Sequence, residues 1–416
     1  SPTTQWLAVG HLYCAGLGMY ILLRTMRFDG QPVGQPAALL GALAFQFSDA
    51  FFIHLGNLNL IAVLSWLPWV FAAYLIALDR RSMCWTVVAA LLFTVANYAG
   101  HAQSSYYIGL ALAAYTAVWF GLEMADLWGE QGNDGGRRWL RAIWSRLQYL
   151  FVVALLTGLL TAPILLPSLE LTQYTARQDF TYQESIAFSL APTQAAVGLF
   201  TPGFFGRGPA LFWGLWDRVE TPYVGVVTLM LAVIGYALAS KGTRRKLWPW
   251  LGVAVFGMLI ALGVYGIVHG LLTVVLPGFD QFRAPARAIV LWALGISVMG
   301  GVGADVVVRR YHRPANTGEQ ALPRGARDRR VNTLLFAGSV IFVGLVVPLL
   351  FFALLATQDD PNAFLHASLA ALAVVLAAAF WLATWAVVAG YRAGWIGAGV
   401  FGVSLIALLF IELTAT

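Results

Sequence analysis

The sequence predicts an all-α, polytopic helical membrane protein with about twelve membrane-spanning helices. Of its 416 residues, 60% are hydrophobic and only 11% are charged, whereas soluble domains carry about 25% charged residues. The apolar residues gather in long runs, such as Val331–Ala356 and Phe364–Ala389, and a helix needs about 20 consecutive apolar residues to cross a bilayer. These features exclude a soluble enzyme, a nucleic-acid-binding domain and a disulfide-rich secreted scaffold.

Charged residues, prolines and glycines divide the chain into its expected spans, which we treat as one transmembrane domain over residues 1–416. The first span ends before Arg24, and the ninth lies between Pro285 and Arg309. Two spans, 37–53 and 84–99, are short for a full crossing, which indicates tilted helices or helices that end below the interface. In order, the expected spans are 5–23, 37–53, 58–78, 84–99, 105–122, 147–166, 223–240, 247–268, 286–308, 332–356, 364–389 and 394–412.

The basic residues orient this array. Loops on alternate sides of the spans hold 20 of the 25 lysines and arginines on one side. The positive-inside rule makes that side cytoplasmic and places both chain ends on the outer side of the cell's inner (plasma) membrane. The net charge of +6 then reflects topology and attraction to anionic membrane lipids, and does not indicate a nucleic-acid partner. The five remaining basic residues, expected outside, are Arg177, Arg207, Arg218, Arg283 and Arg287.

Two loops stand out by length and composition. Residues 168–222 form a long outer loop rich in aromatic residues, prolines and glycines, and we expect short ordered helices in it along the membrane interface. Residues 309–331 form an arginine-rich loop on the cytoplasmic side. The two cysteines, Cys14 and Cys84, form no CxxC pattern, so zinc ribbons, iron–sulfur ligation and c-type haem attachment are excluded.

Polar residues recur at the outer ends of the spans in four stretches, and a fifth stretch, Gly18–Arg24, lies at the cytoplasmic end of the first span. The stretches are Gly18–Arg24 (GMYILLR), His54–Asn59 with the following Trp66–Trp69 (WLPW), Gly100–Gln103 (GHAQ), Leu166–Leu171 (LPSLEL) and Phe282–Arg287 (FRAPAR).

In this order the five stretches resemble the YfhO-like bacterial membrane proteins, which look like glycosyltransferases of the GT-C type. The resemblance covers residues 5–310, and residues 311–416 match only as apolar spans. It implies a GT-C-like architecture and transfer of a sugar from a polyprenyl-phosphate-linked donor at the outer membrane face. It also implies an acidic motif in the first external loop, after the first helix, where a divalent cation would be held in the complete protein.

That acidic motif is missing from the sequence, because no Asp or Glu precedes Asp29. Ser1 is not a start methionine, and an outward N-terminus without a signal peptide suggests that an earlier helix belongs before it. We therefore expect a piece of a longer or processed chain, and whether this piece is an enzyme depends on the missing acid. No catalytic residue can be named, no cofactor is evident, and no metal motif occurs; as it stands, the chain is expected to lack transferase activity.

Arg283 and Arg287 are the candidate phosphate-binding residues. Pro285 suits the first turn of the ninth span, and the exposed amides and positive dipole at that helix start attract anions. Arginine forks match phosphate oxygens. The alternative is that both arginines pair with Asp280 or with lipid headgroups.

A polar outer cavity is expected from side chains at the other outer span ends. We expect most of these side chains and the two arginines to lie within roughly 15 Å of a common point, because neighbouring helices pack about 8–10 Å apart. The cavity residues are His54, Asn57, His101, Gln103 and Glu170.

Each of these residues also has a simpler structural interpretation. His54 and His101 suit general acid–base catalysis, but each can equally be a histidine bonded to a loop carbonyl; haem ligation by the pair is the least favoured reading. Glu170 is a functional candidate because it is ionisable near membrane depth, or it pairs with Arg177. The outer acids Asp179, Glu184, Asp217 and Glu220 either bind a divalent cation or are simply solvated.

Two functions follow. The first is a GT-C-like glycosyltransferase, or its transmembrane part. The second is a non-catalytic accessory or structural subunit of a larger membrane complex, for example a respiratory assembly, which the missing acidic loop favours. A transporter ranks last, because ionisable residues are scarce near the middle of the spans. The partners implied are membrane lipids, a polyprenyl-phosphate sugar and other membrane subunits.

Overall fold

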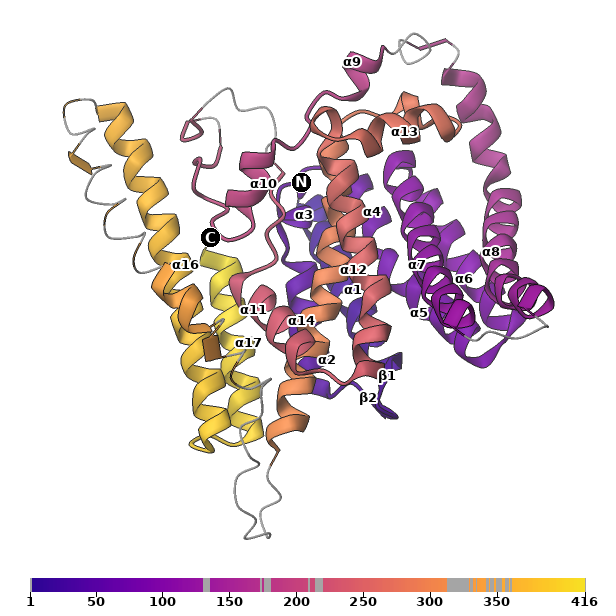
Figure 1. Ribbon diagram of the computed structural model, residues 1–416. Coiled ribbons are helices and arrows are strands. Elements are labelled where there is room, and N and C mark those ends of the chain that lie inside the picture. The colour runs from indigo at the N-terminus through magenta and orange to yellow at the C-terminus, as the bar shows by residue number, and fades with distance from the viewer. Residues whose placement is uncertain are drawn as a thin grey trace.

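A computed structural model describes residues 2–129, 135–172, 174–175, 181–208, 210–213, 220–312 and 361–415, together with 329, 332–333, 335–341, 344, 348, 354–355 and 359. It is a bundle of helices (Figure 1). In this part of the chain, seven helices are long and apolar enough to cross a membrane. The predicted fold class, an all-α polytopic membrane protein, is confirmed.

The helices and strands are numbered in chain order. The helices are α1 (Pro2–Thr25), α2 (Gln35–Gln46), α3 (Asp49–Phe52), α4 (Leu58–Ser65), α5 (Leu67–Arg80), α6 (Met83–Tyr98), α7 (Ala102–Gly129), α8 (Gly135–Thr172), α9 (Tyr182–Ser185), α10 (Pro192–Gly198), α11 (Val226–Leu238), α12 (Lys241–Ala261), η1 (Gly263–Tyr265), α13 (Ile267–Val275), η2 (Phe279–Gln281), η3 (Pro285–Ala288), α14 (Ile289–Tyr311), α16 (Pro361–Ala393) and α17 (Ala398–Ala415). The strands are β1 (Arg27–Phe28) and β2 (Gln31–Pro32).

Every expected span coincides with helix; in 332–356, where the structure describes a little over half of the positions, the described ones are all helical. Two expected spans are each divided in two. Span 37–53 becomes α2 and α3, which meet at Ser48, whose hydroxyl donates to the Phe45 carbonyl (2.7 Å). Span 58–78 becomes α4 and α5, because Pro68 lacks the N–H that a continuous helix needs and begins a new helix instead.

Three features differ from the sequence-based expectations. We expected no sheet, but β1 and β2 pair as an antiparallel hairpin, whose turn residues Asp29 and Gly30 both have positive φ. That geometry is the one Asp-Gly favours in two-residue hairpins. The outer loop begins later than residue 168, because α8 continues through Thr172 despite Pro163 and Pro167. On the other side, residues 309–311 belong to α14, and residues 313–328 of the basic loop lie outside the described part.

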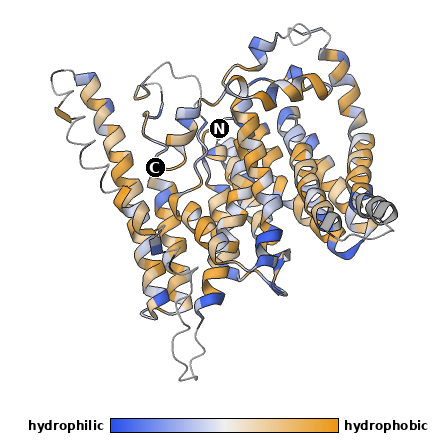
Figure 2. Ribbon diagram, viewed as in Figure 1, coloured by the Kyte–Doolittle hydropathy of each residue, from blue (hydrophilic) through white to orange (hydrophobic). Residues whose placement is uncertain are grey.

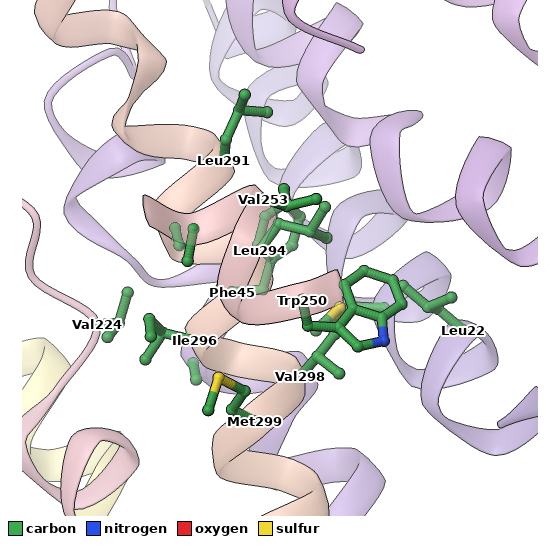
Figure 3. Packing of buried hydrophobic residues seen from close by; sticks show 14 of the residues in the cluster. Leu22, Phe45, Val224, Trp250, Val253, Leu291, Leu294, Ile296, Val298 and Met299 are labelled. Atoms are coloured by element: carbon green, nitrogen blue, oxygen red, sulfur yellow. The ribbon is translucent and has the colours of Figure 1, made fainter. Parts of the chain in front are cut away.

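Helix α14 is the centre of the bundle. Of its apolar window, 89% is buried, compared with 22% for α8 at the side of the molecule. It packs on α2, α11 and α12, and Figure 3 shows Trp250 and Val253 of α12 beside Leu294 of α14.

Glycines let the neighbours of α14 approach its backbone. A Cβ on Gly303 would collide with the Leu231 carbonyl of α11, and a Cβ on Gly235 of α11 would collide with Gly303 itself. On another face, Gly301 meets Gly41 of α2. Small residues at helix crossings replace the hydrophobic driving force that is absent within lipid.

Polar residues collect at the two ends of the bundle, and apolar residues run along the helices (Figure 2). The hairpin β1–β2 lies at one end, while α3, α10 and α13 lie toward the other, together with both chain termini (Figure 1). Helix α13 exposes Ile267, Leu271, Val274 and Val275 and buries His269, the pattern of a helix that lies in a membrane interface. Which end faces the cytoplasm stays a prediction.

Gly303→Ala should destabilise the protein by about 1–3 kcal/mol, because the added methyl overpacks the α11–α14 contact. Thermal unfolding of the purified protein in detergent measures this. The matched control is Gly121→Ala in α7, where a Cβ meets no atom within 4 Å and stability should be equal or higher. Equal losses in both variants would contradict the packing role.

Candidate functional site

A buried histidine–glutamate pair lies at the end of the bundle that carries α3. His54 follows α3 and Glu220 precedes α11, and their side chains are 3% and 1% exposed. The His54 Nε2 and Glu220 Oε1 atoms lie 3.3 Å apart, an ion-pair distance rather than a close hydrogen bond.

The environment of His54 fixes its tautomer. Its Nδ1 lies 3.0 Å from the Ala50 carbonyl oxygen, which can only accept, so Nδ1 carries a hydrogen. A neutral imidazole then presents Nε2 as an acceptor toward another acceptor, the Glu220 carboxylate. Because two buried acceptors repel each other, a proton must lie on Nε2 or on Glu220. The pair therefore places an imidazole nitrogen and a carboxylate oxygen side by side, away from solvent.

Asp49, the first residue of α3, forms a second buried cluster beside this pair. Its Oδ2 accepts from the backbone N–H (3.0 Å) and the hydroxyl (2.5 Å) of Thr221. Its Oδ1 pairs with the Arg207 guanidinium at 2.9 Å. Since Thr221 follows Glu220, both acids hold the same segment against α3.

Gln103 joins the start of α7 to the arginines before α14. Its amide nitrogen donates to the Arg283 carbonyl (2.7 Å) and to the Tyr107 hydroxyl (2.9 Å). Its Oε1 accepts from Nη1 of Arg287 at 2.8 Å. The half-buried Arg287 guanidinium is thus fixed in position, whereas the Arg283 side chain is exposed.

These groups share one neighbourhood. The charges of Arg287 and Glu220 both act on the Tyr107 hydroxyl. The Trp292 indole of α14 also donates to the Pro222 carbonyl at 2.9 Å, which fixes the segment after Glu220 to α14. The half-buried Arg287 and the buried pair His54–Glu220 therefore occupy the same end of the bundle.

A cavity of about 270 Å³ adjoins the Asp49 cluster. Its polar wall contains Arg207 and Thr221. Its apolar wall contains Phe52, Phe205 and Phe212, and the rings of Phe204, Phe205 and Trp213 pack edge to edge close by. It is a small, partly aromatic chamber beside buried charges.

The other predicted cavity residues stabilise local structure. Asn57 caps α4 by accepting from the Leu60 N–H at 3.3 Å. The His101 Nδ1 accepts from the Ser104 N–H at 3.1 Å, at the start of α7. Glu170 is exposed on α8, and no described contact joins it to the other candidates; Arg177, its suggested partner, lies outside the described residues.

The outer acids have separate positions. Glu184 completes a capping box with Thr181 at the start of α9. The Thr181 backbone N–H, followed by its hydroxyl, lowers the pKa of Glu184 below its usual value. Asp179 and Asp217 lie outside the described residues. Among the described residues, no group of three or more His, Cys, Asp or Glu side chains is arranged to hold a metal.

Three buried acids, Asp49, Asp305 and Glu412, were not predicted from the sequence. Glu412 of α17 accepts from the Tyr223 hydroxyl (2.7 Å) and from the backbone amides of Val226 (2.5 Å) and Val227 (3.2 Å). It thereby satisfies the open amides at the start of α11. Each acid stands inside an expected apolar span, and that position was the available signal.

No protein-family model matches the chain, and neither the curated proteins nor the solved structures include a match.

Asp49→Ala should lower the free energy of unfolding by about 3 kcal/mol, because a buried, charge-paired and hydrogen-bonded acid is lost. Chemical denaturation in detergent measures it. Asp126→Ala is the matched control, since Asp126 forms an exposed ion pair with Arg245 and should cost at most about 1 kcal/mol. A similar cost in both variants would argue against the Asp49 cluster as a structural anchor.

His269 should make stability fall on acidification. Burial lowers its pKa below the ordinary value of 6.5, and it packs against the rings of Tyr182 and Phe279. Between the lowered pKa and 6.5, the unfolded chain binds more protons, so this contribution is complete above 6.5 and is lost as pH falls below it. Melting temperatures from about pH 7.5 to 5 should fall less steeply for His269→Phe; parallel curves would refute this.

Proposed function

We propose that this chain is a GT-C-like membrane protein that binds a polyprenyl-phosphate-linked sugar at the bundle end carrying α3 and η3, facing outward from the bacterial inner membrane. The supporting observation is that the buried pair His54–Glu220 shares this end with Arg287, whose guanidinium Gln103 holds. Sugar transfer from a lipid phosphate needs both a group that handles a proton and a cation for the phosphate. Because Glu220 is a candidate for the acid whose expected motif is missing from the sequence, we propose transfer here, in place of the inactive chain expected from the sequence alone.

The residues divide this chemistry between them. Arg287, with Arg283 at the rim, contacts the donor phosphate and stabilises its charge as it leaves. The acceptor hydroxyl oxygen bonds to the sugar carbon as the bond from that carbon to the phosphate oxygen breaks. The hydroxyl proton passes to the Glu220 carboxylate, and the polyprenyl phosphate departs. His54 faces Glu220 through Nε2, because its Nδ1 is hydrogen-bonded to the Ala50 carbonyl oxygen.

A second candidate, a non-catalytic accessory subunit, is favoured by the way the buried acids are engaged. Asp49 is satisfied by Thr221 and Arg207, and Glu412 by the start of α11. Acids that are already saturated stabilise a fold without taking part in chemistry. On this view the polar end positions the chain against other membrane subunits.

The test measures binding and transfer separately. Farnesyl phosphate and its glycosyl ester are titrated into the purified chain in nanodiscs, and sugar transfer is followed with labelled ester. Arg287→Gln should weaken binding about tenfold, since a charge-assisted contact is lost. Glu220→Gln should preserve binding but slow transfer by about 100-fold or more. The control is Arg245→Gln, which alters an ion pair at the other end of the bundle.

Binding without transfer would support the lipid-phosphate site but contradict the proposed transferase activity. Absence of binding, or equal weakening by Arg287→Gln and Arg245→Gln, would overturn the proposal in favour of the accessory subunit.

A further inference from the structure

The end of the bundle that carries the β1–β2 hairpin lies opposite the candidate site (Figure 1). It contains a large cavity of about 900 Å³. The last turns of α1 and α5, the hairpin β1–β2, and parts of α7, α8 and α12 surround it. Its volume is in the range of pockets that hold a whole small molecule. No residue of the proposed lipid-phosphate site lines it.

The lining is strongly basic. Six basic and two acidic side chains line the cavity, which leaves an excess of four positive charges. The acids are Asp79 and Glu123, and the basic residues are Arg24, Arg27, Arg80, Arg81, Arg146 and Lys246. Topology explains why basic residues lie at this end, but it does not require residues from five separate segments to converge on one hollow.

Part of this lining is held rigidly. Arg146 donates to Glu123 Oε1 through Nε (2.9 Å) and Nη2 (2.6 Å), and its guanidinium stacks 4.8 Å from the Trp119 ring. The Trp119 indole in turn donates to the Tyr115 hydroxyl at 2.8 Å. Preorganised arginines lose little side-chain entropy when they bind a ligand.

Other cations remain available. Among the described residues, no ion pair includes Arg27, Arg80, Arg81 or Lys246; the Lys246 ammonium donates only to the Arg27 carbonyl at 2.9 Å. Mutually repelling cations around a hollow attract an anion that compensates them.

Arg81 occupies a backbone position that favours glycine. It ends α5 with φ 50° and ψ 45°, the left-handed conformation in which a side chain costs about 1 kcal/mol. The protein therefore keeps an arginine where folding alone would prefer glycine, and strain of this kind collects at functional sites.

We propose that this cavity binds a phosphate-bearing ligand, supplied either by the headgroup of an anionic phospholipid or by a soluble phosphate ester. The arginine forks match phosphate oxygens, and the Trp119–Tyr115 wall gives the rest of the ligand an apolar surface. The inference does not depend on the proposed function, because the two sites lie at opposite ends of the bundle.

The experiment uses the full chain in phosphatidylcholine nanodiscs, with two probes. Inorganic pyrophosphate represents the soluble source, and dihexanoyl phosphatidic acid represents the lipid source. Arg81→Gly should lower the affinity for whichever probe binds the unmodified chain by about tenfold. It should not lower stability, because glycine suits the left-handed position. Lys246→Gln should act similarly. Lys241→Gln is the matched control, since Lys241 is exposed on the same helix and does not line the cavity.

If pyrophosphate binds and both Arg81→Gly and Lys246→Gln weaken its binding, the result supports a soluble ligand. Selective loss of phosphatidic acid binding supports a lipid headgroup. Failure of both probes to bind the unmodified chain overturns the proposal. Equal weakening by Lys241→Gln also overturns it, because the attraction would then be a diffuse property of the basic end.

Discussion

The close approach of backbones around α14 is the constraint on which the rest of the structure depends. Gly303 admits the backbone of α11, and Gly301 admits that of α2. Lipid solvates apolar side chains as well as a protein interior does, so a membrane bundle gains stability from contact area that small residues make available. Once α14 is enclosed by its neighbours, its two ends can fix the loops that carry the polar groups.

Both polar ends of the bundle are indeed attached to α14. At one end, η3 leads into α14 and carries Arg287, and Trp292 holds the segment after Glu220. At the other end, Arg309 donates to the Phe28 and Pro32 carbonyls of the hairpin (2.8 and 2.7 Å) and pairs with Asp305 at 2.6 Å. The hairpin also lines the basic cavity. One rigid helix therefore positions both the candidate site and the second cavity.

The sequence predicts the apolar spans well because each span is a local property of about 20 residues. It also contains the Asp29-Gly30 signal of the hairpin, which a reading for membrane spans overlooks. It does not predict the partner of His54, because Glu220 is far away in the chain and the pairing exists only once α3 and the segment before α11 are packed together. The basic cavity cannot be predicted from the sequence for the same reason. Membrane topology explains why each arginine lies at this end, but only the packed structure shows that the arginines surround one cavity.

The buried acids show how charge can be placed inside such a bundle. An ionisable group at membrane depth is costly unless it is paired or hydrogen-bonded, and Asp49, Asp305 and Glu412 each meet this requirement with a partner more than 170 residues away. Each acid therefore connects an early segment of the chain to a late one, and losing it would loosen a tertiary contact as well as a local bond. Glu220 differs from these acids, because its carboxylate faces the titratable ring of His54 rather than a backbone amide. Among the buried acids that the structure describes, Glu220 is thus the one whose partner is an imidazole ring.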